Sequence, residues 1–337
     1  ADIAGVVGRK NAIINGNFDI WQRGTSQTAS GYGSDDRWRN IRGGSTQVAS
    51  QQAFALGQTD VPNNPKYYSR IVITSVAGAS SYAIKTQYIE GVEHFAGTTA
   101  TLSFWAKADA SKDIAVEFVQ RFGTTGTPTD PVNVAPTTVS LTTSWVKYTV
   151  PVALPSISGA TLGTDGNDHI RMNFWLDAGS NYNAETNSLG QQSGTFEFSQ
   201  IQMEAGSVAT EFEPRSVGEE LALCQRYFQS IDTNPDNVSS VAASIATGHS
   251  SATTTAYYFL PLIVTMRTTP TFTISNTYDF QSIDTTIRNL TNLAMYQGNT
   301  KGIALVGNAV GFVAGRGSLL RFDSGTYFQF IRMNSEL

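Results

Sequence analysis

The chain has 337 residues, which predicts two domains, or one large domain with an appendage, and is long enough to bury a core. Only 15% of its residues are Asp, Glu, Lys or Arg, against about 25% in typical soluble domains, and the net charge of −5 excludes the electrostatic signature of a nucleic-acid or anionic-lipid partner. The single cysteine, Cys224, excludes a disulfide framework within the chain and a cysteine-based metal cluster.

Residues 1–12 are small and mixed in character, and they predict an N-terminal arm that is compatible with a longer gene product upstream. We expect no cleavable signal peptide, because the apolar run in this arm is short and is interrupted by Gly5, Gly8 and Arg9. We also expect no membrane insertion, because the most apolar stretch, Tyr257–Met266, is too short to span a bilayer and contains Pro261.

Residues 13–214 predict an antiparallel β-sandwich, because short alternating runs are separated by clusters of Gly, Pro, Asn and Ser. The opening Asn15–Gly24 and the closing Phe196–Ser216 are interpreted as its first and last strands. Two polar stretches, Gly123–Pro131 and Gly179–Gly194, predict loops. Representative strands are Tyr68–Thr74, Ala83–Ile89, Ala100–Ala108, Ile114–Phe122, Trp145–Val152, Ile170–Asp177 and Thr195–Met203.

A connecting helix is predicted over residues 215–230. Ser216 and Glu219 stand three residues apart, as in a capping box, so the helix should begin at Val217. The residues spaced 4, 3 and 4 apart that share one helical face are Val217, Leu221, Cys224 and Phe228. This face packs either against the second domain or against identical subunits in a helical seam.

Residues 231–337 predict a second, smaller β domain. In the apolar run Tyr257–Ile274, Pro261 predicts that the first strand is an edge strand or bends. The further predicted strands are Ile283–Leu290, Leu293–Gln297, Gly311–Gly315 and Tyr327–Arg332. The aromatic residues of this domain are expected mainly in its core, with tip-loop tyrosines as possible receptor contacts; they are Tyr257, Tyr258, Tyr278, Tyr296, Phe312 and Tyr327.

Three segments of the chain resemble tail-fibre and receptor-binding virion proteins of tailed bacteriophages. They are NGNFDIWQRG (Asn15–Gly24), SDDRW (Ser34–Trp38) and the closing FEFSQIQMEAGSVATEFEPRS (Phe196–Ser216). The second domain resembles the C-terminal domain of many such fibres in its proline-containing apolar strand, in Met266-Arg267 and Pro270-Thr271, and in its ending Ser335–Leu337.

The first domain also resembles the jelly-roll carbohydrate-binding modules attached to bacterial glycosidases. This resemblance rests on the same opening, on LSFWAKA (Leu102–Ala108) and on IQMEAGSVATEFEP (Ile201–Pro214). Together the resemblances imply an all-β chain with a jelly-roll sandwich, a short helix and a smaller β-sandwich. They also imply a homotrimer on the virion tail, exposed to the extracellular medium, which contacts other tail proteins through the arm and binds a host surface polysaccharide.

Strand alternation gives a candidate glycan site on outward faces of the first domain. If Leu102, Phe104 and Ile170 point into the core, two tryptophans point outward among polar side chains. Sugar recognition needs aromatic stacking surfaces, here Trp105 and Trp175, beside planar hydrogen-bonding groups, here Arg121, Arg171, Asn173 and Asp177. The alternative is that the arm, a long loop or a neighbouring subunit covers these tryptophans.

Signals for catalysis are weak, and we expect neither catalytic nor metal-binding residues. His94, His169 and His249 have no partner at metal-ligand spacing. Carboxylate pairs for glycoside cleavage would be Glu90 with Glu93, or Asp165 with Asp168. The turn Asp165–Asp168 offers three oxygen side chains, those of Asp165, Asn167 and Asp168, for a structural calcium ion, which falls short of a recognised pattern.

Three functional classes follow. The first is a non-enzymatic attachment protein that binds a bacterial glycan, the second is a depolymerase that cuts it, and the third is a purely structural head fibre or collar.

Trp21 and Trp38 are predicted to be structural. Trp21 alternates with Asp19 between turn signals, and Asp36-Arg37-Trp38 resembles a packing and ion-pair element of the phage proteins.

Overall fold

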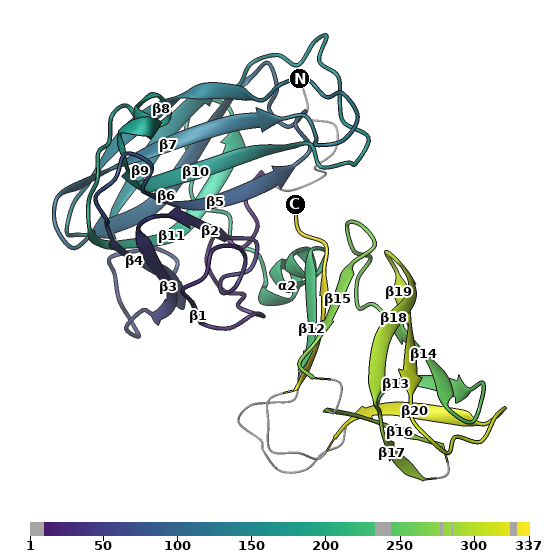
Figure 1. Ribbon diagram of the computed structural model, residues 1–337. Helices are drawn as coiled ribbons and strands as arrows, with labels where there is room; N and C mark the ends of the chain where they lie inside the picture. The colour runs from purple at the N-terminus through teal and green to yellow at the C-terminus, as the bar shows by residue number, and fades with distance from the viewer. Residues whose placement is uncertain (1–9, 233–243, 277–278, 285, 324–328) are drawn as a thin grey trace. The chain divides into compact units, whose positions relative to one another are not determined.

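The computed structural model describes residues 10–232, 244–276, 279–284, 286–323 and 329–337, and the chain divides into two compact units, residues 1–220 and 221–336 (Figure 1). Antiparallel sheets dominate both units, so the predicted all-β class is confirmed. Most of the predicted N-terminal arm, residues 1–9, lies outside the described residues, as do Tyr278 and Tyr327.

The first unit is a sandwich of two sheets that stack as layers (Figure 1). The six-stranded sheet has the order β1 (Ser26–Gln27), β3 (Thr46–Ala53), β4 (Tyr67–Thr74), β11 (Gly194–Ala205), β6 (Thr99–Ala108), β9 (Val146–Ala153). The five-stranded sheet has the order β2 (Arg39–Gly43), β5 (Tyr82–Glu90), β10 (His169–Ala178), β7 (Lys112–Arg121), β8 (Val132–Leu141). The seven strands predicted here are all present, and β1, β2, β3 and β8 are additional.

The core of this unit lies between the two sheets. Every second residue of β6, β7 and β10 points into it, as the alternation predicts, and Phe104, Phe174 and Phe198 meet at its centre with ring centroids 4.9–6.1 Å apart. Trp38 is fully buried and lies 6.5 Å from the ring of Phe174 and 5.4 Å from that of Phe18. Its predicted structural role is therefore confirmed.

The segment Ser34–Trp38 contributes Asp35 to an ion pair that is buried in this core. Lys85 on β5 points inward and pairs with Asp35, and both side chains are fully buried. Asp35 also accepts hydrogen bonds from Ser34 Oγ (2.8 Å) and from Ser69 Oγ on β4 (2.9 Å). The Lys85 ammonium lies over the rings of Phe18 and Trp38, at 5.4 and 5.3 Å. One carboxylate thus connects both sheets.

The opening segment Asn15–Gly24 is not a strand, and that prediction is wrong. Asn15 and Phe18 have φ angles of 57° and 56°, which an extended strand does not allow. The chain instead coils beside β11, where Ala12 N donates to Met203 O and Ile201 N donates to Gly16 O, both at 2.9 Å.

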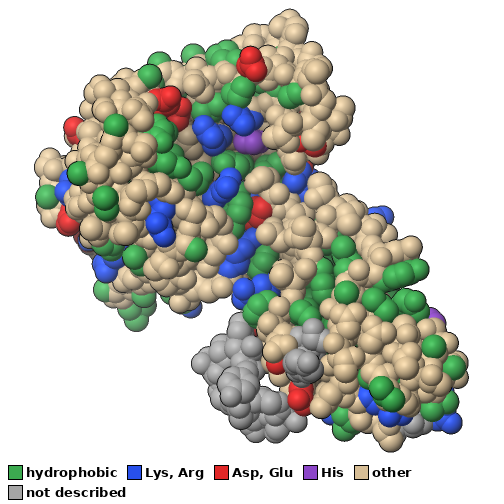
Figure 2. Space-filling model, viewed as in Figure 1, with side chains coloured by type: hydrophobic (Ala, Val, Ile, Leu, Met, Phe, Trp, Pro, Cys, Tyr) green, Lys and Arg blue, Asp and Glu red, His purple; other side chains and the backbone are tan. Residues whose placement is uncertain are grey.

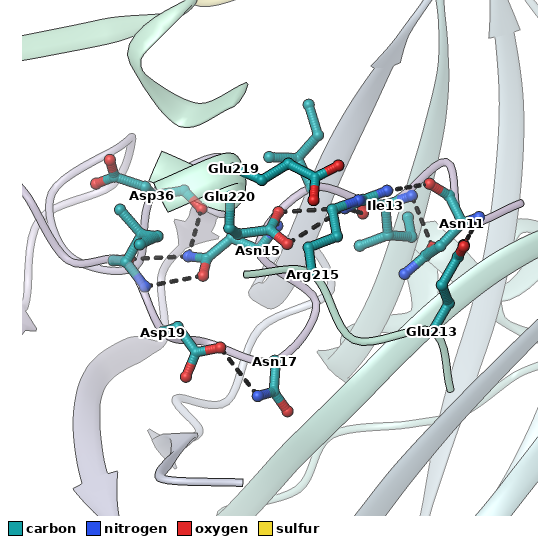
Figure 3. A network of polar contacts seen from close by, with 12 residues as sticks. Asn11, Ile13, Asn15, Asn17, Asp19, Asp36, Glu213, Arg215, Glu219 and Glu220 are labelled. Carbon is teal, nitrogen blue, oxygen red and sulfur yellow. Dashed lines mark hydrogen bonds and ion pairs between the residues drawn. The ribbon is translucent and has the colours of Figure 1, made fainter. Parts of the chain in front are cut away.

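Asn15 lies at the centre of a polar network (Figure 3). Its side chain donates to the carbonyls of Ile20 (2.8 Å) and Asp36 (3.0 Å) and accepts from Ile20 N (3.0 Å). Its backbone N–H donates to Glu220 Oε1 (2.5 Å), and its carbonyl accepts from Trp38 Nε1 (3.0 Å). Both the backbone and the side chain of this buried residue therefore form hydrogen bonds.

The connecting helix, α2 (Val217–Gln225), begins where predicted. Ser216 Oγ accepts a hydrogen bond from Glu219 N (3.3 Å), as an N-cap residue should. The helix ends five residues before the predicted limit at 230. Phe228 belongs to β12 (Phe228–Asp232), where it pairs with Asn334 of β21 (Phe330–Asn334), so it does not share the helical face.

The second unit contains two further sheets. A three-stranded sheet has the order β12, β21, β15 (Thr271–Ile274). A seven-stranded sheet has the order β17 (Ile287–Asn289), β16 (Phe280–Ile283), β20 (Gly317–Phe322), β13 (Ser244–Ser250), β14 (Thr255–Pro261), β19 (Gly302–Asn308), β18 (Asn292–Asn299). Tyr258 and Phe312 are core residues as expected, whereas Tyr296 is exposed.

Three predictions about this unit need correction. The strand with Pro261 lies between β13 and β19 and is not an edge strand; the proline is its last residue, so its missing N–H interrupts no ladder. The segment Gly311–Gly315 is a turn region between β19 and β20. The predicted strand Ile283–Leu290 is not one strand, because Ile283 is the last residue of β16 and Ile287–Asn289 form the separate strand β17.

Replacing Trp38 by Ala should lower the free energy of unfolding by about 3–5 kcal/mol, because a large ring and its hydrogen bond to Asn15 are lost from a closed core. Urea unfolding followed by circular dichroism measures this. Trp145→Ala is the control, since that ring is half-buried on an outer face. Equal midpoints for Trp38→Ala and the unsubstituted protein would contradict the assignment.

Candidate functional site

The six residues of the predicted glycan site divide between the two sheets of the first unit. Trp105 is on β6, in the six-stranded sheet. Arg121 is on β7, and Arg171, Asn173, Trp175 and Asp177 are on β10, both in the five-stranded sheet. The outer faces of a sandwich point in opposite directions, so Trp105 does not join the other five in one site.

Trp175 points outward but is covered, with 4% of its surface exposed. Its ring contacts Tyr182 (centroids 5.2 Å apart) and Tyr82 (6.0 Å), and Leu189 packs against the same cluster. Tyr182 belongs to a short 3-10 helix, η1 (Ser180–Tyr182), which α1 (Asn183–Thr186) follows. The polar loop predicted here therefore covers Trp175 and leaves no stacking surface for a sugar.

Asn173 and Asp177 also serve the fold. Asn173 Nδ2 and Trp175 Nε1 both donate to Glu117 Oε2, each at 2.8 Å, and Asn173 is 1% exposed. Asp177 is fully buried and accepts from Ser45 Oγ (2.6 Å), Ser75 Oγ (2.8 Å) and the backbone N of Gln192 (2.7 Å). Its carboxylate connects three loops at one end of the sandwich. Both of its oxygens already accept hydrogen bonds from the protein, so they are not available to a sugar.

The other two predicted residues, Arg121 and Arg171, lie on the half of this face that the loop leaves open. We call this half the arginine band: Arg39, Tyr88, Arg121, His169 and Arg171. The His169 ring stacks on Tyr88, with centroids 4.5 Å apart and planes 16° apart. Arg39 Nη1 donates to the Tyr88 hydroxyl (2.8 Å), and its guanidinium lies 5.6 Å from the Tyr88 ring centroid.

The strand register brings these five residues together. Arg121 on β7 is directly opposite His169, and Tyr88 on β5 is directly opposite Arg171. Arg39 comes from β2, next to β5. Figure 2, seen from this side, shows basic side chains and a histidine gathered over β5, β7 and β10. Sequence reasoning missed Arg39 and Tyr88 and gave His169 no role, because only the pairing of β2, β5 and β10 places them beside Arg171.

The His169 imidazole is neutral at physiological pH. Its pKa is lowered to about 4, chiefly by burial and also by the charges of Arg121 and Arg171. The hydrogen bond to the Asn167 backbone raises the pKa but does not offset these effects. In the Nδ1–H tautomer the ring donates to Asn167 O at 2.7 Å. The positive charge of the band therefore comes from its arginines alone.

The pKa of His169 predicts a pH dependence of stability. The folded-state pKa lies below the ordinary 6.5, so the unfolded chain binds the proton first. The contribution of His169 is fully present above about pH 6.5 and is lost as the pH falls towards 4, by up to roughly 3 kcal/mol. Unfolding free energies of the unsubstituted protein and of His169→Gln, measured from pH 7.5 to 4, should diverge over this window. Parallel curves would contradict the prediction.

Two of the carboxylates considered for catalysis or calcium, Asp165 and Asp168, bind backbone groups. Asp165 accepts from Thr124 N (3.0 Å), from the Thr124 hydroxyl and from Asn167 N (3.3 Å), and chiefly the hydroxyl lowers its pKa to about 2. Asp168 Oδ2 accepts from Val92 N (3.0 Å).

Within the described ranges, no group of three or more His, Cys, Asp or Glu side chains could hold a metal ion. No helix among these residues is long and apolar enough to cross a membrane.

The outer face of the six-stranded sheet is built differently. Phe54, Tyr68 and Trp145 pack together there, with centroids 4.7–5.3 Å apart. Beside them, Glu197 pairs with Arg70 (2.6 Å) and with Lys107 (3.0 Å). The cations near these rings are therefore neutralised by a carboxylate, unlike those of the arginine band.

No protein-family model matches the chain, and no curated protein matches it. Similar solved structures include a family 11 carbohydrate-binding module from Clostridium thermocellum in complex with a β-1,3-1,4-mixed-linked tetrasaccharide, at 12% identity and a TM-score of 0.31, covering 55% of this chain and 98% of that one. A putative sugar-binding protein from Bacteroides thetaiotaomicron matches at 13% identity and a TM-score of 0.34, covering 58% and 100%. The enzymatically active domain of bacteriophage CBA120 tailspike protein 4 matches at 14% identity and a TM-score of 0.35, covering 58% of this chain and 21% of that one. These likenesses concern the fold alone.

Proposed function

We propose that the chain is a virion attachment protein of a tailed bacteriophage, a tail-fibre or tail-tip component that binds a bacterial cell-surface glycan without cleaving it. The observation that carries the proposal is the arginine band, where three partly exposed arginine side chains lie together over the buried Tyr88–His169 ring pair on the outer face of the sheet. The resemblance of Asn15–Gly24 and Phe196–Ser216 to phage fibre proteins supports the virion setting.

The shape of the band favours a chain of sugars over a single one. Its residues come from four neighbouring strands, β2, β5, β10 and β7. Neighbouring strands lie about 4.8 Å apart, so the band extends over roughly 15 Å across the sheet. Planar guanidinium donors suit sugar hydroxyls, and the buried Tyr88 helps to position one of them, because its hydroxyl accepts a hydrogen bond from Arg39.

Binding without cleavage is favoured by the chemistry of the band. Glycoside cleavage needs two carboxyl groups at about 5–10 Å that can take opposite acid and base roles. Glu117, the carboxylate at the middle of this face, is buried and already accepts from Asn173 and Trp175 through Oε2. The groups that remain open, Arg121 and Arg171, neither protonate a leaving group nor attack a sugar.

Arg171→Ala should weaken binding to an array of bacterial surface polysaccharides by roughly tenfold, because one charge-assisted hydrogen-bonding group is lost. Its melting temperature should change little, since Arg171 is half-buried and has no ion-pair partner in the described chain. Trp105→Ala, on the opposite sheet, is the control and should bind normally.

A second measurement on the same samples tests the absence of cleavage. Polysaccharide that the protein binds should release no reducing ends during prolonged incubation. Reducing-end release would favour a depolymerase. In the binding measurement, normal binding by Arg171→Ala together with lost binding by Trp105→Ala would place the site on the six-stranded sheet.

The proposal includes a homotrimer, with the N-terminal arm, residues 1–12, contacting other tail proteins. Exposed apolar side chains on the seven-stranded sheet support subunit contacts. Phe259 is 57% and Leu319 38% exposed, and both lie opposite Thr247 of β13, so they share one face. An apolar row of this kind is typical of a surface that another subunit covers.

Light scattering at micromolar concentration should give three times the chain mass of 36.3 kDa. Phe259→Ser should shift the protein towards the monomer, because it removes apolar surface from the proposed contact. Val208→Ser is the control, since that exposed side chain belongs to the first unit. A monomeric unsubstituted protein would contradict the trimer.

A further inference from the structure

We infer that the glycan bound by the arginine band is acidic and that Arg39, Arg121 and Arg171 hold its carboxylate or phosphate groups. The inference rests on the proposed function and names the chemical class of its ligand. Three observations carry it. The arginines have no carboxylate partner in the described chain, the nearby carboxylates do not pair with them, and the charge of the band is constant over the physiological pH range.

The first observation is that these three guanidinium groups have no carboxylate partner. Elsewhere in the first unit arginines form ion pairs, such as Arg70 with Glu197 at 2.6 Å and Arg215 with Glu220 at 3.2 Å. In the part of the chain that the structure describes, Arg39, Arg121 and Arg171 lie within ion-pair distance of no Asp or Glu. A chain with 22 basic and 27 acidic residues has ample carboxylates, so three unpaired arginines on one face need another explanation.

The second observation concerns the carboxylates nearest to the band. By strand register, Glu117 and Glu90 point to the same outer face. Glu117 is buried beside Asn173 and Trp175, and Glu90 lies at the end of β5 opposite His169. Asp168 precedes β10 and binds Val92 N. Glu117 and Asp168 therefore already accept hydrogen bonds from the protein, and neither they nor Glu90 form an ion pair with the three arginines.

The third observation is that the band keeps its charge over the physiological range. Arginine stays protonated throughout, and its planar fork matches the oxygens of carboxylate and phosphate groups in a bidentate way. His169 is neutral and contributes none of this charge. The rings of Tyr88 and His169 are buried, at 7% and 8% exposure, so the partly exposed guanidinium groups are what the band offers to an anionic substituent.

The test compares polysaccharides of matched backbone in affinity electrophoresis. The probes are polygalacturonate for carboxylate, its fully methyl-esterified form as the uncharged match, lipoteichoic acid for phosphate, and dextran as a neutral polymer. We expect the protein to bind polygalacturonate or lipoteichoic acid at least tenfold more tightly than the methyl ester and dextran. This binding should weaken as the salt concentration rises about tenfold, from roughly 0.05 to 0.5 M, because screening reduces charge attraction.

Variants assign the effect to the band. Arg121→Gln and Arg171→Gln should each weaken binding to the preferred anionic probe by roughly tenfold. Lys66→Gln removes the same charge from an exposed position before β4, in the other sheet, and should bind normally. Thermal unfolding of all three variants verifies folding, and Arg171→Lys, which keeps the charge without the planar fork, should bind at an intermediate level.

The outcomes separate this inference from the proposed function. Binding of the methyl ester or dextran as tightly as both anionic polymers would overturn the acidic ligand while glycan binding stands. An equal loss in Lys66→Gln and Arg121→Gln would overturn the role of the band, because net charge alone would then explain the effect. Binding of none of the four polymers would overturn both.

Discussion

The buried pair of Lys85 and Asp35 is the interaction on which the first unit depends. Lys85 comes from the five-stranded sheet, and Asp35 also accepts from Ser69 of the six-stranded sheet, so one carboxylate joins both layers. Burial lowers the pKa of Lys85, whereas the charge of Asp35 raises it. Removing either partner would leave an uncompensated charge in the core, which typically costs several kcal/mol. The ion pair therefore fixes how the two sheets face each other.

Asn15 completes this arrangement at the edge of the core. Its bonds to Ile20, Asp36, Trp38 and Glu220 connect the opening segment, the Ser34–Trp38 segment and the start of α2 (Figure 3). A positive φ angle explains why asparagine stands here, since it tolerates this conformation better than most residues. The segments NGNFDIW and SDDRW thus supply residues that build the sandwich.

The two outer faces of the sandwich differ in how their charges are treated. On the six-stranded sheet, Glu197 neutralises Arg70 and Lys107 beside a packed aromatic cluster. On the five-stranded sheet, a covering loop closes one half over Trp175 and leaves the other half open with its arginines unpaired within the described residues. This difference between the two faces is the basis of the ligand class proposed for the arginine band.

The sequence by itself determined the all-β class, the seven main strands of the sandwich, the start of α2 and the inward faces, because alternation and capping are local properties. It also gave Arg121 and Arg171 as outward residues. The tertiary structure decided the rest. Strand order separated Trp105 from β10, a loop distant in sequence covered Trp175, and cross-strand register brought Arg39, Tyr88 and His169 to Arg171. Pairing between strands far apart in the chain leaves no local pattern in a single sequence, which is why the site emerged only with the fold.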